Sequence, residues 1–591
     1  MISYLIIFFS LLIILFPKKK DIKADTFYSL IFCSLSYSQV ILGFISLVLI
    51  LFGVSRFPTL IISCLLFLFT FARNKNSIKY LKRTKTFLLN EVIQIIKKQE
   101  NSKYQKILFC LCILLLVAIS ISSIGPINHP DAADYHVGYP FQYFLRGNFF
   151  VDGGLHQGLL GIGDYANLAF IQENSIWLIR FLQIINLPLL FIFLAKKFKN
   201  NIYLLTFLSV PTIIQWSTIG KPLFLGESSL IAIYLIWRQN KDSFSLKLLL
   251  ISIVSCLSVK ISSSLVITPI FFDLGIYYYQ NYKLKKELLK TIKDSVCSRE
   301  FIFINLILLT LLYSRYIITG NFAYPLLTNI FNKGDDLVIN FSNFLKNYQR
   351  QELFIIKLFI PTKLSNIGET LGLSTLLIIL GIIVNTIKNN KLIKNNLFNV
   401  SISQLFLLFL FGQGRSDYYI GPLILIIYQY ENFKLLILKS KLKYIFYLTT
   451  IFQFMLINIY LSISIFYNFQ AFFDYENFMK KTAYGYANST LIDMSLPGKT
   501  FINDRNTRLY YSFDYFEKDK LKKCIKNKTL EFGEKAEEMC FKENDITQIL
   551  SSKESEKFKN LYECKNINSF KTSRNFLKRK PYIINYCKIK N

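Results

Sequence analysis

Long apolar blocks alternate with short basic segments along most of this chain. The stretches 107–124, 301–318 and 444–467 are apolar over nearly their whole length. Each is close to the ~20 residues that a helix needs to cross the hydrocarbon core of a bilayer. Because a helix buried in a soluble protein rarely stays apolar on every face, the pattern predicts an all-α polytopic membrane protein.

The positions of these blocks predict about fourteen transmembrane helices. The predicted spans lie near residues 2–16, 27–52, 57–72, 107–125, 176–195, 202–218, 222–237, 245–259, 261–279, 300–318, 369–388, 397–412, 418–430 and 445–468. The first block has no basic segment before it and no small-residue cleavage site after it. We therefore expect it to be a retained helix rather than a cleaved signal peptide.

Lysine and arginine are concentrated in every second connection between the predicted spans. Such a bias orients a membrane protein, because positive residues stay on the cytoplasmic side. The predicted cytoplasmic segments are 17–26, 73–106, 196–201, 238–244, 280–299, 389–396 and 431–444. The predicted outer segments are 126–175, 219–221, the turn at Lys260, 319–368, 413–417 and 469–591. We therefore expect a protein of the cell (inner) membrane whose N-terminus and C-terminal domain are non-cytoplasmic.

The polar sequence after the last apolar block predicts a second domain. We divide the chain into a multi-pass transmembrane domain, 1–468, and a small exported soluble domain of mixed structure, 469–591. The exported part holds four of the ten cysteines: Cys524, Cys540, Cys564 and Cys587. Four cysteines in an oxidising compartment predict two disulfides, and all three pairings remain open.

The formal net charge of +32 raises the question of a nucleic-acid partner. The positive residues lie in short connections between apolar blocks, not on a basic helix with interleaved aromatic residues in a soluble unit. This distribution is typical of residues that set membrane topology. We therefore expect these lysines and arginines to lie at the lipid bilayer, and we expect no nucleic acid as a partner.

The first large outer loop, 126–175, concentrates residues capable of acid–base chemistry. It contains all three histidines of the chain and four aspartates: His129, His136, His156, Asp131, Asp134, Asp152 and Asp164. A carboxylate beyond a membrane helix can act as a general base toward a hydroxyl group or bind a divalent ion. Asp131 and Asp134 are three residues apart, so a helical turn would place them on one face. The alternative is that Asp131 only caps a helix starting at Ala132, and that the histidines make local hydrogen bonds.

Further candidates lie on the same predicted side of the membrane. Lys221 and Glu227 flank the start of a predicted helix, and an acidic residue in an apolar block is costly unless it is paired or faces a cavity. Lys260, at an outer turn, is placed to meet a phosphate, although snorkelling to the interface is an equal alternative. Arg315 and Arg415 are candidates for bidentate phosphate binding.

The sequence DAADYH at 131–136 is followed by YFLRG at 143–147. These residues resemble the first outer loop of the glycosyltransferase C superfamily, in particular of the bacterial branch related to mannosyl- and aminoarabinose-transferases. The sequence TGNFAYP at 319–325 is similar to another outer loop, with Phe322 in place of the usual proline. The third motif, QGRSDYY at 413–419 with Pro422, resembles the entry to a late helix, although two residues separate its arginine from its tyrosine.

This resemblance implies a membrane glycosyltransferase that moves a sugar from a polyprenyl-phosphate donor to a lipid, glycan or protein acceptor on the non-cytoplasmic face. It implies Asp131 as the catalytic base, with Asp134 as the second choice. The substrate-binding candidates from all these arguments are His136, Tyr135, Lys221, Glu227, Lys260, Asn321 and Arg415. No cofactor is certain; if Mg²⁺ or Mn²⁺ is used, Asp131 and Asp134 are the expected ligands.

Two other functions stay open on the sequence. A flippase or transporter for a lipid-linked glycan should show inverted repeats, broken helices and charges at mid-membrane depth, and no repeat is visible. An O-antigen-type polymerase or ligase should have an arginine-rich second outer loop, but 319–368 contains only Arg350. The polymerase requires arginines that converge in a cavity, whereas the transferase requires Asp131 to face one.

Overall fold

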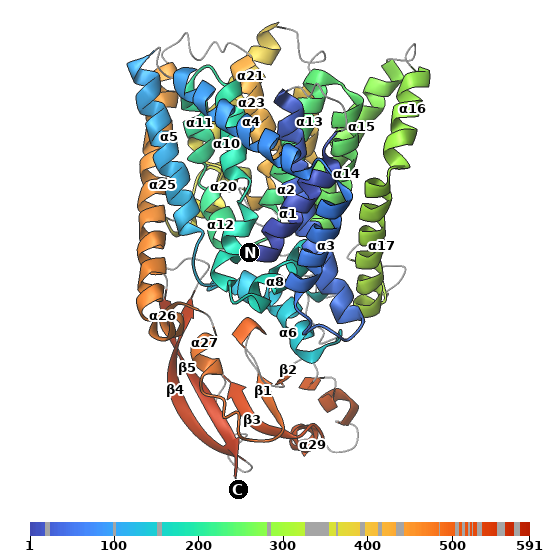
Figure 1. The fold of residues 1–591 in the computed structure, drawn as a ribbon. Coiled ribbons are helices and arrows are strands. Elements are labelled where there is room, and N and C mark those ends of the chain that lie inside the picture. The colour runs from blue at the N-terminus through green and yellow to red at the C-terminus, as the bar shows by residue number, and fades with distance from the viewer. Residues whose placement is uncertain are drawn as a thin grey trace.

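The computed structural model contains a helical bundle with a small β-sheet domain at one end (Figure 1). It describes residues 1–590 except 18–23, 99–101, 151–155, 281–284, 325–353, 362–363, 390–395, 412–415, 433–441, 484, 503–507, 511–514, 518–520, 523, 529–534, 552–561 and 573–578. Arg350 and Arg415 lie outside the described residues.

Helices between Ile2 and Phe473, most of them apolar, form the bundle. In its first half they are α1 (Ile2–Leu15), α2 (Ala24–Leu51), α3 (Thr59–Arg73), α4 (Ser77–Lys98), α5 (Lys103–Ser122), α6 (Gly138–Arg146), α7 (Ile162–Tyr165), α8 (Asn167–Gln172), α9 (Ile179–Gln183), α10 (Leu187–Lys197), α11 (Asn201–Leu208) and α12 (Ile213–Thr218). In its second half they are α13 (Phe224–Asn240), α14 (Ser243–Val259), α15 (Ser264–Gln280), α16 (Lys285–Val296), α17 (Arg299–Thr319), α20 (Phe354–Phe359), α21 (Leu373–Asn389), α22 (Asn396–Phe411), α23 (Ile420–Asn432) and α25 (Leu442–Phe473).

Within the described residues, seven helical segments are long and apolar enough to cross a membrane. They are Ala24–Leu51, Lys103–Ser122, Ile176–Lys197, Ile261–Gln280, Arg299–Thr319, Ile367–Val384 and Lys443–Phe473. These segments indicate a membrane protein and confirm its helical class. The predicted count of fourteen spans is not confirmed, although every predicted span coincides with a helix or a pair of helices.

The remaining predicted spans are short or broken helices. The helix α1 has 14 residues, fewer than the ~20 that a perpendicular span needs. The predicted span 202–218 is divided into α11 and α12 around Pro211, because a proline lacks the N–H that a continuous helix requires. These predicted spans therefore differ from the seven longer segments in being shorter or in being divided into two helices.

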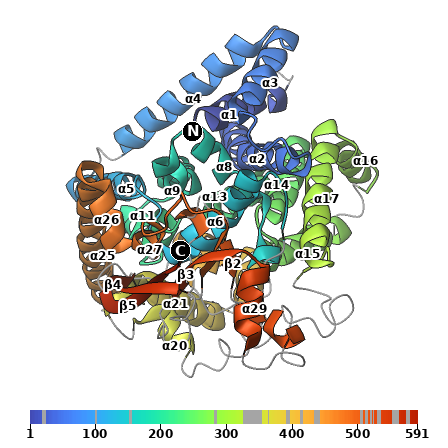
Figure 2. The same cartoon turned by 90° about the horizontal axis from the view of Figure 1, so that it is seen from below.

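Two amphipathic helices occupy segments that the sequence predicts only as basic connections. The helix α4 lies in the predicted connection 73–106, and α16 lies in 280–299. Figure 2 shows α4 as a long helix at the periphery of the bundle. The high density of lysine in both segments conceals a helical spacing of apolar residues.

Contacts between loops define the end of the bundle that carries the C-terminal domain, here called the sheet end. Lys221 pairs with Asp417 there, and Arg508 of the C-terminal domain pairs with Asp134. Arg315 donates to the carbonyl oxygen of Leu160 over 2.8 Å. Segments predicted to be on the outer side thus gather at the sheet end.

The helix α4 lies at the opposite end, here called the α4 end (Figure 1). Its Lys98 donates to the carbonyl oxygen of Ala195 near the end of α10. Its Glu91 pairs with Lys196 and accepts a hydrogen bond from the Tyr28 hydroxyl near the start of α2. The two ends therefore correspond to the two sets of connections that the lysine and arginine distribution separates.

The C-terminal domain is a mixed five-stranded sheet with short helices. Its elements are α26 (Tyr475–Thr482), α27 (Tyr486–Ser489), β1 (Lys499–Ile502), β2 (Tyr515–Glu517), α29 (Ala536–Glu543), β3 (Ile546–Ser551), β4 (Tyr562–Thr572) and β5 (Arg579–Ile589). The strand order is β2-β1-β3-β5-β4, with parallel pairing of β1 to β2 and β3 and antiparallel pairing of β5 to β3 and β4. The side chain of Phe541 on α29 packs with Phe501 and Ile549 to form the core of this domain.

Two disulfides link elements of this domain. Cys564 on β4 lies opposite Cys587 on β5 and is bonded to it. Cys540 on α29 is bonded to Cys524. Of the three pairings that the sequence leaves open, the structure therefore contains one, and both bonds constrain the part of the chain that follows the bundle.

Candidate functional site

The first outer loop packs into the sheet end of the bundle as a series of short helices. Close backbone approaches fix its position, and two glycines permit them. A Cβ atom on Gly161 would lie 1.8 Å from the carbonyl oxygen of Val259, and one on Gly43 would lie 2.0 Å from that of Ile162. The helix α7 can therefore lie between α2 and the end of α14, which brings Asp164 toward the turn at Lys260.

Asp131 is buried directly before a π-helical turn, Ala132–His136. Its side chain makes no capping hydrogen bond to that turn, and the residue is 4% exposed. Its backbone N–H donates to Nδ1 of His129 over 3.2 Å, so a neutral His129 carries its proton on Nε2. The structure thus shows no capping hydrogen bond from Asp131 to this turn, and the role of its carboxylate stays a prediction.

Asp134 forms an ion pair with an arginine of the C-terminal domain. Arg508 Nη1 lies 2.6 Å from Asp134 Oδ1, and both side chains are nearly buried. The guanidinium group of Arg508 lies 4.1 Å from the ring centroid of Tyr139, and its carbonyl oxygen accepts from Gln142 Nε2. A Cβ atom on Gly138 would lie 2.9 Å from Cβ of Arg508, so glycine makes room for the inserted arginine.

His136 forms a fully buried pair with Asp164 of the same loop. His136 Nδ1 and Asp164 Oδ1 are 2.7 Å apart, and neither side chain is exposed. The other oxygen of Asp164 accepts from the backbone N–H of Gly161, and Asn167 donates to the carbonyl oxygen of His136. Burial raises the pKa of Asp164 to about 6. When Asp164 is ionised it accepts the Nδ1 proton, which leaves Nε2 of a neutral His136 as the basic nitrogen.

Lys260 lies in the turn between α14 and α15 and contributes a buried positive charge. Its Nζ lies 5.5 Å from the ring centroid of Tyr135, and the residue is 6% exposed. Within the described part of the chain, Lys260 forms neither an ion pair nor a side-chain hydrogen bond. Burial and the neighbouring charge of Lys221 lower the pKa of Lys260, whereas Asp164 raises it.

Lys221 is held by a residue of the third sequence motif. Its Nζ lies 2.6 Å from Asp417 Oδ2, and both side chains are buried. Trp216 Nε1 donates to the carbonyl oxygen of Asp417, and the Lys221 ammonium group lies 3.8 Å from the ring centroid of Tyr418. The loop that precedes α23 therefore reaches the same end as the first outer loop and Lys260.

Glu227 on α13 is fully buried beside the same turn. Its Oε1 accepts from the Ser263 hydroxyl over 2.8 Å, whereas Oε2 is buried without a hydrogen-bond partner among the described residues. A buried carboxylate oxygen without a partner is costly, so such groups are commonly retained for function. Lys260 and Lys221 both act on Glu227 electrostatically, which assigns it to the same cluster of charges.

Asn321 and Arg315 hold the backbone of the second outer loop. Asn321 Oδ1 accepts from the Ala323 N–H over 2.9 Å and shapes the turn after α17. Both terminal nitrogens of Arg315 donate to carbonyl oxygens, those of Tyr324 and Leu160. Asn321 and Arg315 therefore both stabilise the backbone of the described part of the chain.

The donor set does not fit a divalent metal. Among the described residues, no group of three or more histidine, cysteine, aspartate or glutamate side chains is arranged to hold an ion. Asp134 is engaged by Arg508, whereas Mg²⁺ prefers an octahedral shell of free oxygen ligands. We therefore derive no reaction step through a metal at Asp131 and Asp134.

Four residues of the cluster were not among the sequence-based candidates for substrate binding or catalysis. Asp164 lies in the first outer loop, and Asp417 lies in the QGRSDYY motif at 413–419. These positions are the sequence signal that could have identified the two residues. Ser263 follows Lys260 by three residues, and Arg508 has no local signal at all. Its partner Asp134 is 374 residues away in the sequence.

Three described arginines at the sheet end bind other protein groups. Arg180 donates to Asn468 Oδ1 and to the carbonyl oxygen of Ser122, Arg315 donates to two carbonyl oxygens, and Arg508 pairs with Asp134. No protein-family model matches the chain, and neither a curated protein nor a solved structure matches it.

Proposed function

We propose that this protein is a membrane glycosyltransferase that moves a sugar from a polyprenyl-phosphate donor to a lipid, glycan or protein acceptor at the sheet end. The observation that carries the proposal is the gathering of acid–base groups and lysines at one end of an apolar bundle. The gathered residues are Asp131, Asp134, His136, Asp164, Lys221, Glu227 and Lys260. A carboxylate can take the proton of a hydroxyl acceptor, and the lysines can bind a phosphate group. The apolar bundle can contact a prenyl chain.

In this proposal Asp131 accepts the proton of the attacking hydroxyl group. The acceptor oxygen bonds to the anomeric carbon of the sugar as the bond from that carbon to the phosphate oxygen breaks. The electron pair leaves with the phosphate, and the proton passes to the carboxylate. Asp131 is assigned as the base because it matches the acidic position of the motif in the first outer loop. Asp134, which pairs with Arg508, holds the loop and orients the acceptor.

Lys260 stabilises the departing phosphate better than Lys221 does. The charge of Lys221 is compensated by Asp417 at 2.6 Å, whereas Lys260 has no described ion-pair partner. A fixed positive charge in a site with little water stabilises developing negative charge strongly. His136, oriented by Asp164, is a positioning residue that presents Nε2 to a substrate hydroxyl group.

The same proposal places the sheet end on the non-cytoplasmic side of the cell (inner) membrane. The connections rich in lysine and arginine fall at the α4 end, as expected for a cytoplasmic face. The C-terminal domain at the sheet end holds two disulfides, which persist in oxidising compartments. Both observations support one orientation.

The test is the variant Asp131→Asn, expressed in cells from which the native protein has been deleted. Asp25→Asn is the matched control, because it makes the same chemical change at the α4 end, where Asp25 lies 3.4 Å from Lys197. Mass spectrometry of cell-surface glycolipids and glycans should show one sugar unit lost in the deletion strain and in Asp131→Asn, and restored by Asp25→Asn. Membrane abundance of both variants must match the native protein. Full restoration of the sugar by Asp131→Asn would remove Asp131 as the base and withdraw the proposal.

A further inference from the structure

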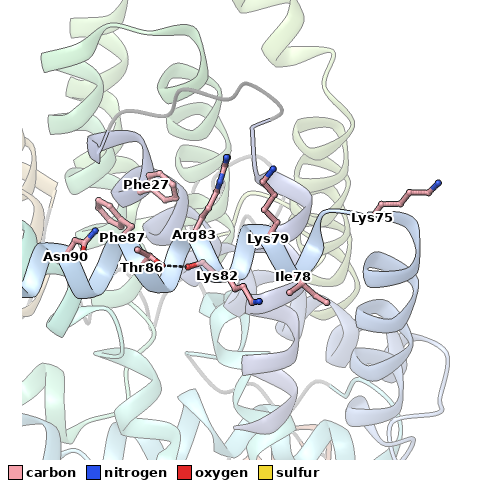
Figure 3. Close-up of a pocket in the computed structure, with 9 residues that line it drawn as sticks. All are labelled: Phe27, Lys75, Ile78, Lys79, Lys82, Arg83, Thr86, Phe87 and Asn90. Atoms are coloured by element: carbon pink, nitrogen blue, oxygen red, sulfur yellow. Dashed lines mark hydrogen bonds between the residues drawn. The ribbon is translucent and has the colours of Figure 1, made fainter.

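A groove at the α4 end lies on the opposite side of the bundle from the candidate site. It is formed by α4 and the start of α2 (Figure 3) and has a volume of about 710 Å³. Its lining residues are Phe27, Lys75, Ile78, Lys79, Lys82, Arg83, Thr86, Phe87 and Asn90. The lining thus combines four cations with apolar and neutral polar side chains, and it contains no acidic residue.

The cations of the groove lie at or near the surface of the protein. Lys75, Lys79 and Lys82 are exposed, and Arg83 is half-buried. In the described part of the chain none of the four has an acidic partner. Figure 3 shows the side chains of Lys79 and Arg83 on one side of α4, whereas those of Lys82 and Ile78 point to the other side. Uncompensated cations grouped in this way attract a phosphate.

The C-terminal half of the same helix is different, because protein groups engage its charges. Glu91 lies 2.9 Å from Lys196, and Lys98 donates to the carbonyl oxygens of Ala195 and Phe198. Charged groups of the C-terminal half thus help to fix the helix to the bundle. The N-terminal half is held by ring contacts, such as that of Tyr80 with Phe16, and its four cations make no such contact in the described part of the chain.

Two aromatic side chains, Phe27 and Phe87, line the groove near Arg83 (Figure 3). The rings of Phe27 and Phe87 are stacked with their centroids 4.8 Å apart, and Phe16 contacts Phe27 at 5.8 Å. Ile78 adds an exposed apolar side chain at the rim. A ligand that fits these surfaces has an anionic head and an apolar portion next to it.

The helix α4 has the features of an amphipathic helix that lies at a membrane surface. It connects α3 to α5, and the segment containing α5 is long and apolar enough to cross a membrane. Leu89, Ile93 and Ile96 are each about half exposed on the side away from the bundle. Apolar side chains exposed beside lysines are typical of a helix that rests in the interfacial layer of a bilayer.

We propose that this groove binds the headgroup phosphate of an anionic phospholipid. Lys79 and Arg83 bind the phosphate oxygens, and Lys75 and Lys82 add to the positive field around them. Phe27 and Phe87 contact the glycerol and the first part of the acyl chains. The neighbouring apolar stripe holds the groove at the depth of the headgroups, where a membrane lipid reaches it more readily than a soluble phosphate does. The inference is independent of the proposed sugar transfer.

The first test is a titration of the purified full chain with phosphatidylglycerol in a neutral detergent, read by native mass spectrometry. The variant Lys79→Gln/Lys82→Gln/Arg83→Gln should bind roughly a hundredfold more weakly, since each cation near an anionic surface contributes a factor of about five. The matched control is Lys290→Gln/Lys293→Gln/Arg299→Gln, which removes the same charge from exposed residues of α16 and the start of α17. It should retain nearly native affinity. Equal losses in the two variants would overturn the proposal in favour of nonspecific surface attraction.

A second measurement on the unmodified protein does not depend on the folding of a variant. Lysine acetylation read by peptide mass spectrometry should show protection of Lys79 and Lys82 by phosphatidylglycerol, and none of Lys290 and Lys293. Phosphatidylcholine should protect neither pair. Equal protection by soluble glycerol phosphate would overturn the lipid assignment and identify a soluble phosphate as the ligand.

Discussion

Two ion pairs at the sheet end are buried, whereas the cations of the groove on α4 are exposed or half-buried and have no acidic partner in the described part of the chain. Asp134 with Arg508 and Lys221 with Asp417 are each 2.6 Å apart, and their side chains are almost removed from solvent. The lysines of the groove reach solvent, and in the described part of the chain they meet no carboxylate. The same residue types thus have opposite surroundings at the two ends.

This difference separates two uses of charge in a membrane protein. Taking a charge out of water costs several kcal/mol, so a buried charge depends on its partner. An exposed lysine costs little and acts through its field on whatever approaches. Removing one member of a buried ion pair at the sheet end should therefore lower stability, whereas removing several cations from the groove should change ligand binding alone.

The largest expected effect is that of Lys221→Met. It leaves Asp417 buried without its cation, and we expect the free energy of unfolding to fall by about 4 kcal/mol. Thermal unfolding in a neutral detergent measures the loss, and the double variant Lys221→Met/Asp417→Asn should recover most of it. The matched variant Lys260→Met should change stability by less than about 1 kcal/mol and still abolish transfer, since Lys260 lacks a described ion pair. Equal destabilisation by the two lysine variants would erase the distinction between the paired and the unpaired lysine.

The next effect is that of Arg508→Ala at the contact between the two domains. It should lower the free energy of unfolding by about 3 kcal/mol, because it leaves Asp134 nearly buried without its cation. Limited proteolysis should then release the C-terminal domain more readily. Arg508→Ala/Asp134→Asn should restore resistance, and failure to do so would show that the arginine acts by packing on Tyr139 instead.

A smaller effect concerns the pH dependence of the His136–Asp164 pair. Burial raises the pKa of Asp164 to about 6, and the ionised carboxylate accepts a stronger hydrogen bond from Nδ1–H of His136 than the protonated carboxyl group does. Transfer by the reconstituted protein should therefore rise about tenfold from roughly pH 5 to pH 7. Stability should change in the opposite direction and fall as pH rises toward 6, because the folded state binds more protons than the unfolded state. If the transfer rate of Asp164→Asn still rises in the same way with pH, a group other than Asp164 causes the pH dependence.

The smallest expected effect lies at the α4 end. In neutral detergent, Lys79→Gln/Lys82→Gln/Arg83→Gln should change the free energy of unfolding by less than about 0.5 kcal/mol, because exposed charges contribute little to stability. The midpoint of thermal unfolding measures this. A loss comparable to that of Lys221→Met would show that the groove is part of the fold and would end the contrast between the two ends.

The sequence predicted the long helices well and the amphipathic ones poorly. A run of ~20 apolar residues is a signal in itself, so α2 and α17 begin and end within a few residues of the predicted spans. The helix α4 buries Thr84, Glu91 and Ile95, at separations of seven and four residues. That spacing indicates a helix, but the frequent lysines make the segment read as a connection.

At the site, the sequence predicted a location better than it predicted partners. The three histidines in one loop pointed to the first outer segment, and His136 lies there in a buried pair with Asp164. The partners of Lys221 and Asp134 are 196 and 374 residues away. No periodicity or spacing encodes such pairs, since they depend on how the helices between them pack.

The insertion of Arg508 beside Asp134 has a consequence for the order in which the protein is made. The ribosome produces Asp134 early and Arg508 only after every helix of the bundle. Until the C-terminal domain has been translated and folded, the first loop carries an aspartate that lacks its cation. The first loop therefore gains this ion pair only after the C-terminal domain has folded. A chain whose synthesis stops within the bundle lacks the Asp134–Arg508 pair.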